Sequence, residues 1–164
     1  CKTAKQIDFK QSEKIQLRSE ETAKLASKIA SFPNLREILN SKQIEFAETN
    51  KKKYGGCILD GRDIGTKILP NANFKFFINA SVEIRAKRRL LEKNISFLHE
   101  NDEKCMLQSL IIEINKRDVS DVKRTVSPLV PAEDAFIIDT SSIDADELLS
   151  IVTNIIEGSS KKAD

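Results

Sequence analysis

The most constraining stretch of this chain is Gly55–Thr66 (GGCILDGRDIGT), in which glycine-bounded apolar residues give way abruptly to charged ones. A short apolar run, Cys57–Leu59, follows the paired glycine, and such a run predicts a buried strand of a parallel sheet. Ligands of open α/β sheets bind at the carboxyl ends of such strands. We therefore expect Asp60, Arg62 and Asp63 to face a polar ligand. The alternative at this point is an ordinary strand-to-helix loop with solvated charges.

Helical and extended patterns alternate along the rest of the chain. Apolar runs at Phe74–Ile78 and Ala135–Ile138 predict two further strands, and apolar residues at helical spacing predict helices around them. Such alternation is typical of an α/β protein in which helices flank a parallel sheet in three layers. The expected helices cover about residues 20–30, 34–53, 81–93, 104–117 and 144–157, with a polar loop at 94–103. The last helix is expected to end at Gly158 and to bury Leu148, Leu149, Val152, Ile155 and Ile156.

Composition and charge exclude several classes of function. Lys and Arg number 27 against 25 Asp and Glu, so the net charge of +2 lacks the basic excess of a dedicated nucleic-acid-binding protein. No apolar run reaches the roughly 20 residues that span a bilayer. Three dispersed cysteines and one histidine give no metal-binding pattern. We expect a monomeric cytoplasmic protein with reduced thiols, no metal-ligating residues, no nucleic-acid partner and no membrane contact.

The segment RDVSDVKR carries the densest charge pattern. Arg117, Asp121 and Arg124 are spaced i, i+4 and i+7, so they share one face of a helix. Two guanidiniums beside one carboxylate suit a phosphorylated sugar, because arginine binds phosphate bidentately and a carboxylate accepts hydrogen bonds from sugar hydroxyls. A surface ladder of i,i+4 ion pairs is the alternative interpretation.

A second basic cluster, Arg85, Arg88 and Arg89, precedes the polar loop at 94–103. Phosphoryl transfer needs positive charge directed at the moving phosphoryl group. A loop that closes over phosphates as a lid would hinge beside such a cluster. A solvated helix face is the alternative for these arginines.

Ser27 and Arg36 are weaker candidates. Together with Asp63 they offer hydrogen-bond donors and acceptors that suit the edge of a nucleobase. Ser27 lies in an alanine-rich helical pattern and Arg36 in the next one, so placement on helix surfaces is the alternative.

In their order and spacing, the motifs GRDIGT, RAKRR, RD-x-x-D-x-x-R and SPLVPAEDAFIIDTS resemble those of the bacterial cytidylate kinases, the CMP/dCMP kinases of the nucleoside monophosphate kinase group. The resemblance spans about residues 17–157. It implies the P-loop kinase fold, with residues 1–53 as the remainder of the nucleoside-monophosphate-binding region and residues 54–164 as the carboxy-terminal part of the core, including a lid at about 85–124. It also implies transfer of the γ-phosphoryl group of ATP, with Mg²⁺, to CMP or dCMP.

The resemblance implies a role for each candidate residue as well. Cytosine would be contacted by Ser27, Arg36 and Asp63, and the nucleotide phosphate by Arg62 and Arg124. The sugar would be contacted by Arg117 and Asp121, and the ATP phosphates by Arg88 and Arg89. The catalytic arginines would be Arg85, Arg88, Arg89 and Arg124.

One motif of that family is missing from the 164 residues. The family opens with a strand, a phosphate-binding loop of the form G-x-x-G-x-G-K-[ST] and a helix, whereas the paired glycine Gly55-Gly56 has no following Lys-Ser/Thr. The missing strand would lie between Cys57–Leu59 and Phe74–Ile78, so without it these strands would lack a partner. We expect this chain, which begins at Cys1, to be a piece of a full kinase. The alternatives are a non-catalytic nucleotide-binding remnant and a kinase for another nucleoside monophosphate.

Overall fold

The computed structural model describes residue 25 and residues 32–92, 99–124 and 128–160. The chain divides into two compact units, Cys1–Asp60 and Gly61–Asp164. Ser27 and almost all of the helix expected at 20–30 lie outside the described residues.

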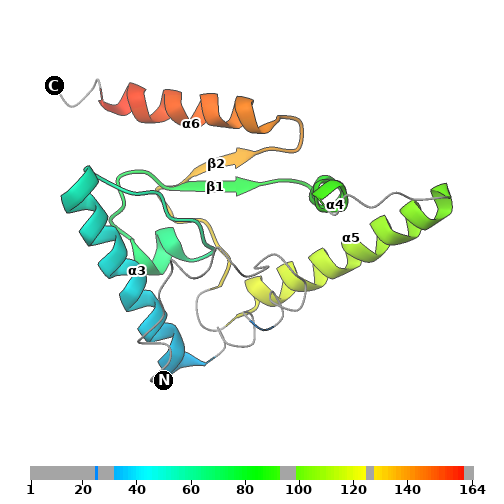
Figure 1. Cartoon of the computed structure of the whole chain (residues 1–164), viewed down its shortest axis with the longest axis horizontal. Coiled ribbons are helices and arrows are strands. Elements are labelled where there is room, and N and C mark those ends of the chain that lie inside the picture. Colours follow the sequence, from blue (N-terminus) through cyan, green and yellow to red (C-terminus); the bar gives the residue numbers. More distant parts are fainter. Residues whose placement is uncertain (1–24, 26–31, 93–98, 125–127, 161–164) are drawn as a thin grey trace. The chain divides into compact units, whose positions relative to one another are not determined.

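The first unit contributes helix α3 (Pro33–Tyr54), which confirms the helix predicted over 34–53 (Figure 1). Pro33 stands in the first turn, where its missing N–H has no intrahelical acceptor to lose. Gly55 ends the helix in the left-handed conformation, with φ of 83°, and its N–H donates to the Lys51 carbonyl oxygen at 3.0 Å. Glycine adopts this conformation without the steric cost of a Cβ atom, so its position after α3 marks the end of the helix.

The prediction of a buried strand at Cys57–Leu59 is wrong. These residues have no regular secondary structure, and the side chain of Ile58 is 97% exposed. A strand forms only where its backbone groups bond to a neighbouring strand. Within the described ranges the sheet contains β1 and β2 alone, so residues 57–59 are not part of it.

Strands β1 (Phe76–Asn79) and β2 (Phe136–Asp139) of the second unit lie side by side and parallel (Figure 1). Phe76 pairs with Phe136 and Asn79 with Asp139, so both strands end at the same edge of the sheet. The rings of Phe76 and Phe136 stack with their centroids 5.6 Å apart. Both predicted strands are confirmed, each displaced by one or two residues toward the carboxyl end.

Helices α4 (Val82–Glu92) and α5 (Glu100–Val122) pack against each other. Ala86 and Leu90 of α4 form a buried cluster with Leu110 and Ile114 of α5. The first turn of α4 is capped by Ser81, whose Oγ accepts a hydrogen bond from the Ile84 N–H at 3.3 Å. The apolar residues at helical spacing in α5 therefore lie on the face that packs against α4.

Helix α5 is longer at both ends than the sequence pattern predicted. It begins at Glu100, so the end of the expected loop at 94–103 is helical, and it continues to Val122. The acidic residues Glu100, Asp102 and Glu103 made this segment look like a polar loop. In the first turn of a helix, however, such side chains stabilise the positive end of the helix dipole.

Helix α6 (Ala145–Ser160) begins where predicted, because Asp144 caps it. The Asp144 carboxylate accepts hydrogen bonds from the N–H groups of Asp146 and Glu147, both at 2.9 Å, and the Glu147 carboxylate accepts one from the Asp144 N–H at 3.1 Å. Reciprocal bonds of this kind satisfy donors that the helix itself leaves unpaired. The expected end at Gly158 is wrong, because this glycine stays within the helix and does not adopt a positive φ.

The burial expected for α6 is also not observed. Leu149 is 64% exposed, and no α6 residue whose side chain is described is buried. The other four residues expected in the core, Leu148, Val152, Ile155 and Ile156, are half-buried. An apolar stripe shows which face of a helix can be buried, whereas burial itself requires an element packed against that face.

Lys75 and Asp134 fasten together the segments that lead into β1 and β2. Lys75 Nζ lies 2.7 Å from both carboxylate oxygens of Asp134 and also donates to the carbonyl oxygen of Pro70. The hydrogen bond from Lys75 holds the pKa of the Asp134 carboxyl below its ordinary value.

We expect the stability difference between the wild type and Asp134→Asn to be pH-dependent. A carboxyl group whose pKa is lowered in the folded state stabilises the fold above its unfolded pKa of about 3.9, and this stabilisation is lost as the pH falls through the folded value. Urea denaturation of both proteins between pH 3 and pH 7 should show a constant difference above about pH 5 and convergence below about pH 4. A difference that is independent of pH would contradict this account.

Candidate functional site

The buried carboxylate of Asp121 is the centre of the candidate site. Its side chain is 1% exposed and lies in the last turn of α5. Arg124 Nη2 lies 2.6 Å from Oδ1, Arg117 Nε lies 3.9 Å from Oδ2, and the Arg62 guanidinium also contacts Oδ2. We call Arg62, Arg117, Asp121 and Arg124 the Asp121 cluster.

The Asp121 cluster is not the surface ladder of ion pairs that was the alternative interpretation of the spacing of Arg117, Asp121 and Arg124. Arg117 and Asp121 share a helix face, as predicted, but a surface ladder has a solvated carboxylate and Asp121 is buried. A further guanidinium, that of Arg62, reaches the same carboxylate from a distant part of the sequence. The two motifs GRD and RD-x-x-D-x-x-R therefore form one site.

The backbone around Arg62 is fixed on its carboxyl side by a short π-helical turn, η2 (Ile64–Ile68). The Asp63 carbonyl oxygen accepts hydrogen bonds from the N–H groups of Lys67, at 2.9 Å, and Ile68, at 3.3 Å. On the other side, a Cβ atom at Gly61 would lie 2.9 Å from Cγ1 of Ile64. A larger residue at position 61 would therefore displace the turn that sets the direction of Arg62.

Positive charge exceeds negative charge around Arg62. Its pKa is lowered, first by burial and then by nearby guanidiniums, while the Asp118 carboxylate acts in the opposite direction. The charged groups concerned are Arg62, Arg85, Arg117, Arg124, Asp118 and Asp121. Among these groups guanidiniums outnumber carboxylates, and an oxyanion such as phosphate would offset the difference.

The arginines of α4 all contact other residues of the second unit. Arg85 Nε donates to the Ala80 carbonyl oxygen at 3.0 Å, and its Nη2 donates to Asp118 Oδ2 at 2.7 Å. Arg89 Nη1 lies 3.4 Å from Glu113 Oε1. Two ion pairs therefore connect α4 to α5 on the flank of their apolar core.

Arg88 binds instead at the carboxyl end of β2. Its guanidinium donates to the Thr140 hydroxyl at 3.0 Å, to the Thr140 carbonyl oxygen at 2.6 Å and to the Ile143 carbonyl oxygen at 3.1 Å. Thr140 is buried, and its hydroxyl donates to the Asn79 carbonyl oxygen at the end of β1. These acceptors are neutral, so the contacts hold the Arg88 side chain without offsetting its charge.

Three residues are expected to contact a nucleobase. Ser27 lies outside the described residues, Arg36 lies in α3 of the first unit, and Asp63 immediately precedes η2 in the second unit. Their shared role stays a prediction.

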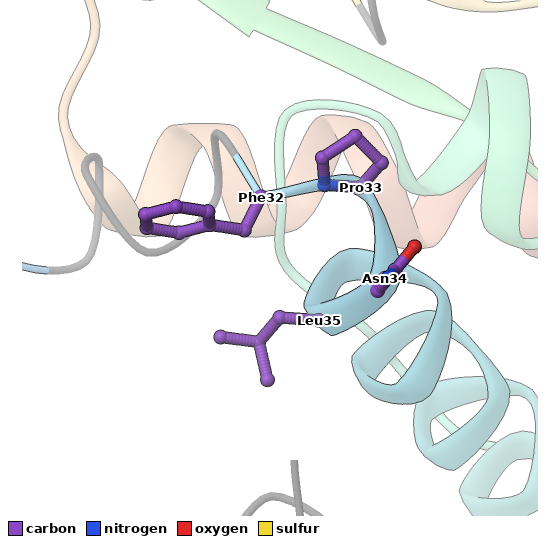
Figure 2. A pocket seen from close by; sticks show the side chains of 4 residues that line it. All are labelled: Phe32, Pro33, Asn34 and Leu35. Atoms are coloured by element: carbon purple, nitrogen blue, oxygen red, sulfur yellow. The ribbon is translucent and has the colours of Figure 1, made fainter.

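A shallow hollow of about 370 Å³ lies at the start of α3 and is lined by Phe32, Pro33, Asn34 and Leu35. Figure 2 shows the side chains of Phe32 and Leu35 extending to the same side of the helix start. None of the four lining side chains is charged, so this hollow lacks the groups that bind phosphate.

Sequence reasoning missed two residues that organise the site. Asp118 and Thr140 bind Arg85 and Arg88, respectively, yet neither falls in a spacing pattern with its partner. No signal in a single sequence pairs residues that lie on different elements.

Comparison with known proteins assigns the chain to a family. The family model for cytidylate kinase matches residues 4–158. The chain belongs to the cytidylate kinase family. It is 44% identical to the cytidylate kinase of Paramagnetospirillum magneticum over 140 residues, which cover 85% of this chain and 64% of that protein. For the cytidylate kinase of Desulforamulus reducens the identity is 44% over 144 residues, which cover 87% of this chain and 60% of that protein.

A third relative, the cytidylate kinase of Pasteurella multocida, is 39% identical over 142 residues, which cover 87% of this chain and 58% of that protein. This chain therefore spans less than two thirds of the length of these cytidylate kinases. Membership of the cytidylate kinase family confirms both the resemblance and the α/β fold class of P-loop kinase type that the motifs predicted. The parallel pairing of β1 and β2 agrees with that class. Among the described residues, none of the helices combines the length and the hydrophobicity of a transmembrane span.

Proposed function

We propose that this chain provides the nucleoside-monophosphate-binding residues of a cytidylate kinase, which transfers the γ-phosphoryl group of ATP to CMP or dCMP. The observation that carries the proposal is the Asp121 cluster, in which Arg62 and Arg124 bind one buried carboxylate amid an excess of positive charge. The names of the cytidylate kinases that the chain resembles support the choice of reaction.

In this proposal, Arg62 and Arg124 bind the phosphate of CMP. Asp121 holds both guanidiniums before the substrate arrives, so they need not reorganise when charge develops in the transition state. Arg117 and the Asp121 carboxylate lie beside them and would contact the sugar hydroxyls. The phosphoryl group passes directly from ATP to CMP, and the arginines stabilise the charge on its oxygens.

We further assign Arg88 and Arg89 to the ATP phosphates. The Arg88 charge is not offset by the neutral oxygens that hold it, and the 3.4 Å contact of Arg89 with Glu113 is the longer of the two ion pairs between α4 and α5. Both residues belong to the lid proposed at about 85–124. Arg85 lies in the same segment, and its two strong contacts favour a supporting role within that lid.

The proposal extends to the organisation of the protein. Residues 1–53 would belong to the nucleoside-monophosphate-binding region, and residues 54–164 to the carboxy-terminal part of the kinase core. In the same proposal, Ser27, Arg36 and Asp63 read the cytosine base, and the enzyme acts as a cytoplasmic monomer.

A Mg²⁺ ion accompanies ATP in the proposed reaction. Within residues 32–92, 99–124 and 128–160, no group of three or more His, Cys, Asp or Glu side chains is arranged to hold a metal ion. The roles proposed for the arginines and Asp121 do not depend on a Mg²⁺ site formed by these residues.

A substrate panel tests the proposed function. The native gene product, supplied with ATP and Mg²⁺, should phosphorylate CMP and dCMP with kcat/KM values at least about tenfold above those for UMP and AMP. Faster turnover of UMP or AMP would favour a kinase for another nucleoside monophosphate. Binding of CMP without any turnover would favour the non-catalytic remnant.

Asp63→Ala is expected to reduce the discrimination between CMP and UMP. A carboxylate can accept a hydrogen bond from the exocyclic amine of cytosine, which uracil lacks, and a hydrogen bond to a charged group contributes about 1.5–3 kcal/mol. We therefore expect kcat/KM for CMP to fall roughly ten- to hundredfold while that for UMP changes little. Asp134→Asn, which removes a carboxylate outside the site, is the control. A loss of equal size for CMP and UMP would rule out a role in reading the base.

A further inference from the structure

Arg85 joins three elements of the second unit. It lies in the first turn of α4, the helix that follows β1 in the chain (Figure 1). One edge of its guanidinium donates to the carbonyl oxygen of Ala80, the residue after β1, and another donates to the carboxylate of Asp118, near the end of α5. The contact with Asp118 is therefore a connection between the carboxyl edge of the sheet and the end of α5.

The guanidinium makes this connection rigid. Its donors lie in one plane at fixed angles, so a group that binds Ala80 through Nε and Asp118 through Nη2 sets the distance between those two acceptors. A lysine has a single nitrogen on a flexible chain and cannot hold both acceptors in this way.

The Asp121 cluster lies at the end of α5 that this connection holds. Asp118 follows Arg117 directly and precedes Asp121 by less than one helical turn. Arg62 is close enough to both Asp118 and Arg85 for their charges to affect it. Displacement of this end of α5 would therefore move Arg117, Asp121 and Arg124 together.

We propose that Asp118 is a positioning residue for the phosphate of the nucleoside monophosphate. Through Arg85 it holds the end of α5 so that Arg62 and Arg124 are directed at the same phosphate group. Arg85 acts in this role by holding Asp118 and does not need to touch a nucleotide. The inference rests on the proposed function, in which that phosphate belongs to CMP.

The direction in which Asp118→Asn changes the affinity for CMP distinguishes a positioning role from a simple effect of charge. The substitution removes a negative charge beside the cluster, so electrostatics alone predicts tighter binding of the CMP phosphate. Asparagine offers Arg85 only a neutral acceptor, so the connection weakens, and positioning predicts weaker binding instead. Asp118→Glu keeps the charge and the acceptor, so it should restore most of the affinity.

The test is calorimetric titration of CMP, and of cytidine as a probe without phosphate, into the native gene product in the absence of ATP. We expect Asp118→Asn and Arg85→Lys each to raise the Kd for CMP about tenfold, and the double variant to show no further loss because both substitutions break the same connection. The Kd for cytidine should stay within about twofold. Glu113→Gln is the matched control, because it breaks the other ion pair between α4 and α5, and it should also change the Kd for CMP by less than about twofold.

Unchanged or tighter binding of CMP by Asp118→Asn would overturn the inference, as would multiplicative losses in the double variant or equal losses for CMP and cytidine. Those results would leave the proposed function intact, since the wild type would still bind CMP. Failure of the wild type to bind any nucleoside monophosphate would overturn the proposed function, and the inference with it.

Discussion

Asp121→Ala is expected to lower the free energy of unfolding by about 3 kcal/mol and to abolish phosphorylation of CMP. Removal of one partner from a buried ion pair costs about 3–5 kcal/mol, because the remaining charge is left without compensation. The lower end of that range applies here, since the side chains of Arg62, Arg117 and Arg124 are between 25% and 47% exposed and water can solvate them in part. Urea denaturation and a CMP phosphorylation assay on the same preparation measure the two effects.

Two further variants separate the charge of Asp121 from its shape. Asp121→Asn keeps the size of the side chain and loses the charge, so it should lose activity as severely as the alanine variant. Glu103→Gln removes an exposed carboxylate from the first turn of α5 and should change the stability by less than about 1 kcal/mol. Near-normal activity of Asp121→Asn would show that the arginines do not depend on the carboxylate charge.

Arg124→Lys is expected to reduce kcat/KM for CMP by roughly 10³-fold while the fold stays stable. Arginine binds a carboxylate and a phosphate with different edges of one planar group, and Arg124 already uses Nη2 for Asp121. Lysine keeps the charge but loses that geometry, so the charge would remain while the phosphate would no longer be oriented. Steady-state kinetics with CMP as the varied substrate measures the loss.

The adjacent residue provides the control for Arg124→Lys. Lys123 is exposed and has no proposed role, so Lys123→Ala should leave kcat/KM within about twofold. A loss of less than tenfold in Arg124→Lys would mean that only the charge of residue 124 matters. In that case residue 124 would supply charge alone, and Arg62 would orient the phosphate.

Sequence patterns predicted those elements that are stabilised by residues close to one another in the sequence. Caps such as Ser81 and Asp144 and the apolar spacing of α5 depend on neighbouring residues in the sequence, and the helices form as expected, although α5 is longer at both ends and α6 continues past Gly158. The strand at Cys57–Leu59 and the burial of α6 depend on partners elsewhere in the fold. A single sequence does not show whether such partners are present, and both of these predictions were wrong.

In the candidate site, too, the features set by neighbouring residues were predicted, and those that depend on distant residues were not. The spacing of Arg117 and Asp121 on one helix face followed from the sequence, whereas the approach of Arg62 to the same carboxylate required the tertiary structure. Burial of Asp121 was likewise invisible in a segment rich in charged residues. The resemblance to cytidylate kinases connected the two motifs before the structure showed their contact.

The packing of α4 against α5 has a consequence for how the second unit folds. β1 and β2 can pair only after the long segment between Asn79 and Phe136 has been closed into a loop, and closure costs more entropy as the loop grows. The apolar contacts between Ala86, Leu90, Leu110 and Ile114 join residues much closer in sequence. Contacts of short sequence separation form early, so assembly of the helical pair shortens the loop that remains. The pairing of β1 with β2 then needs only the closure of this shorter loop.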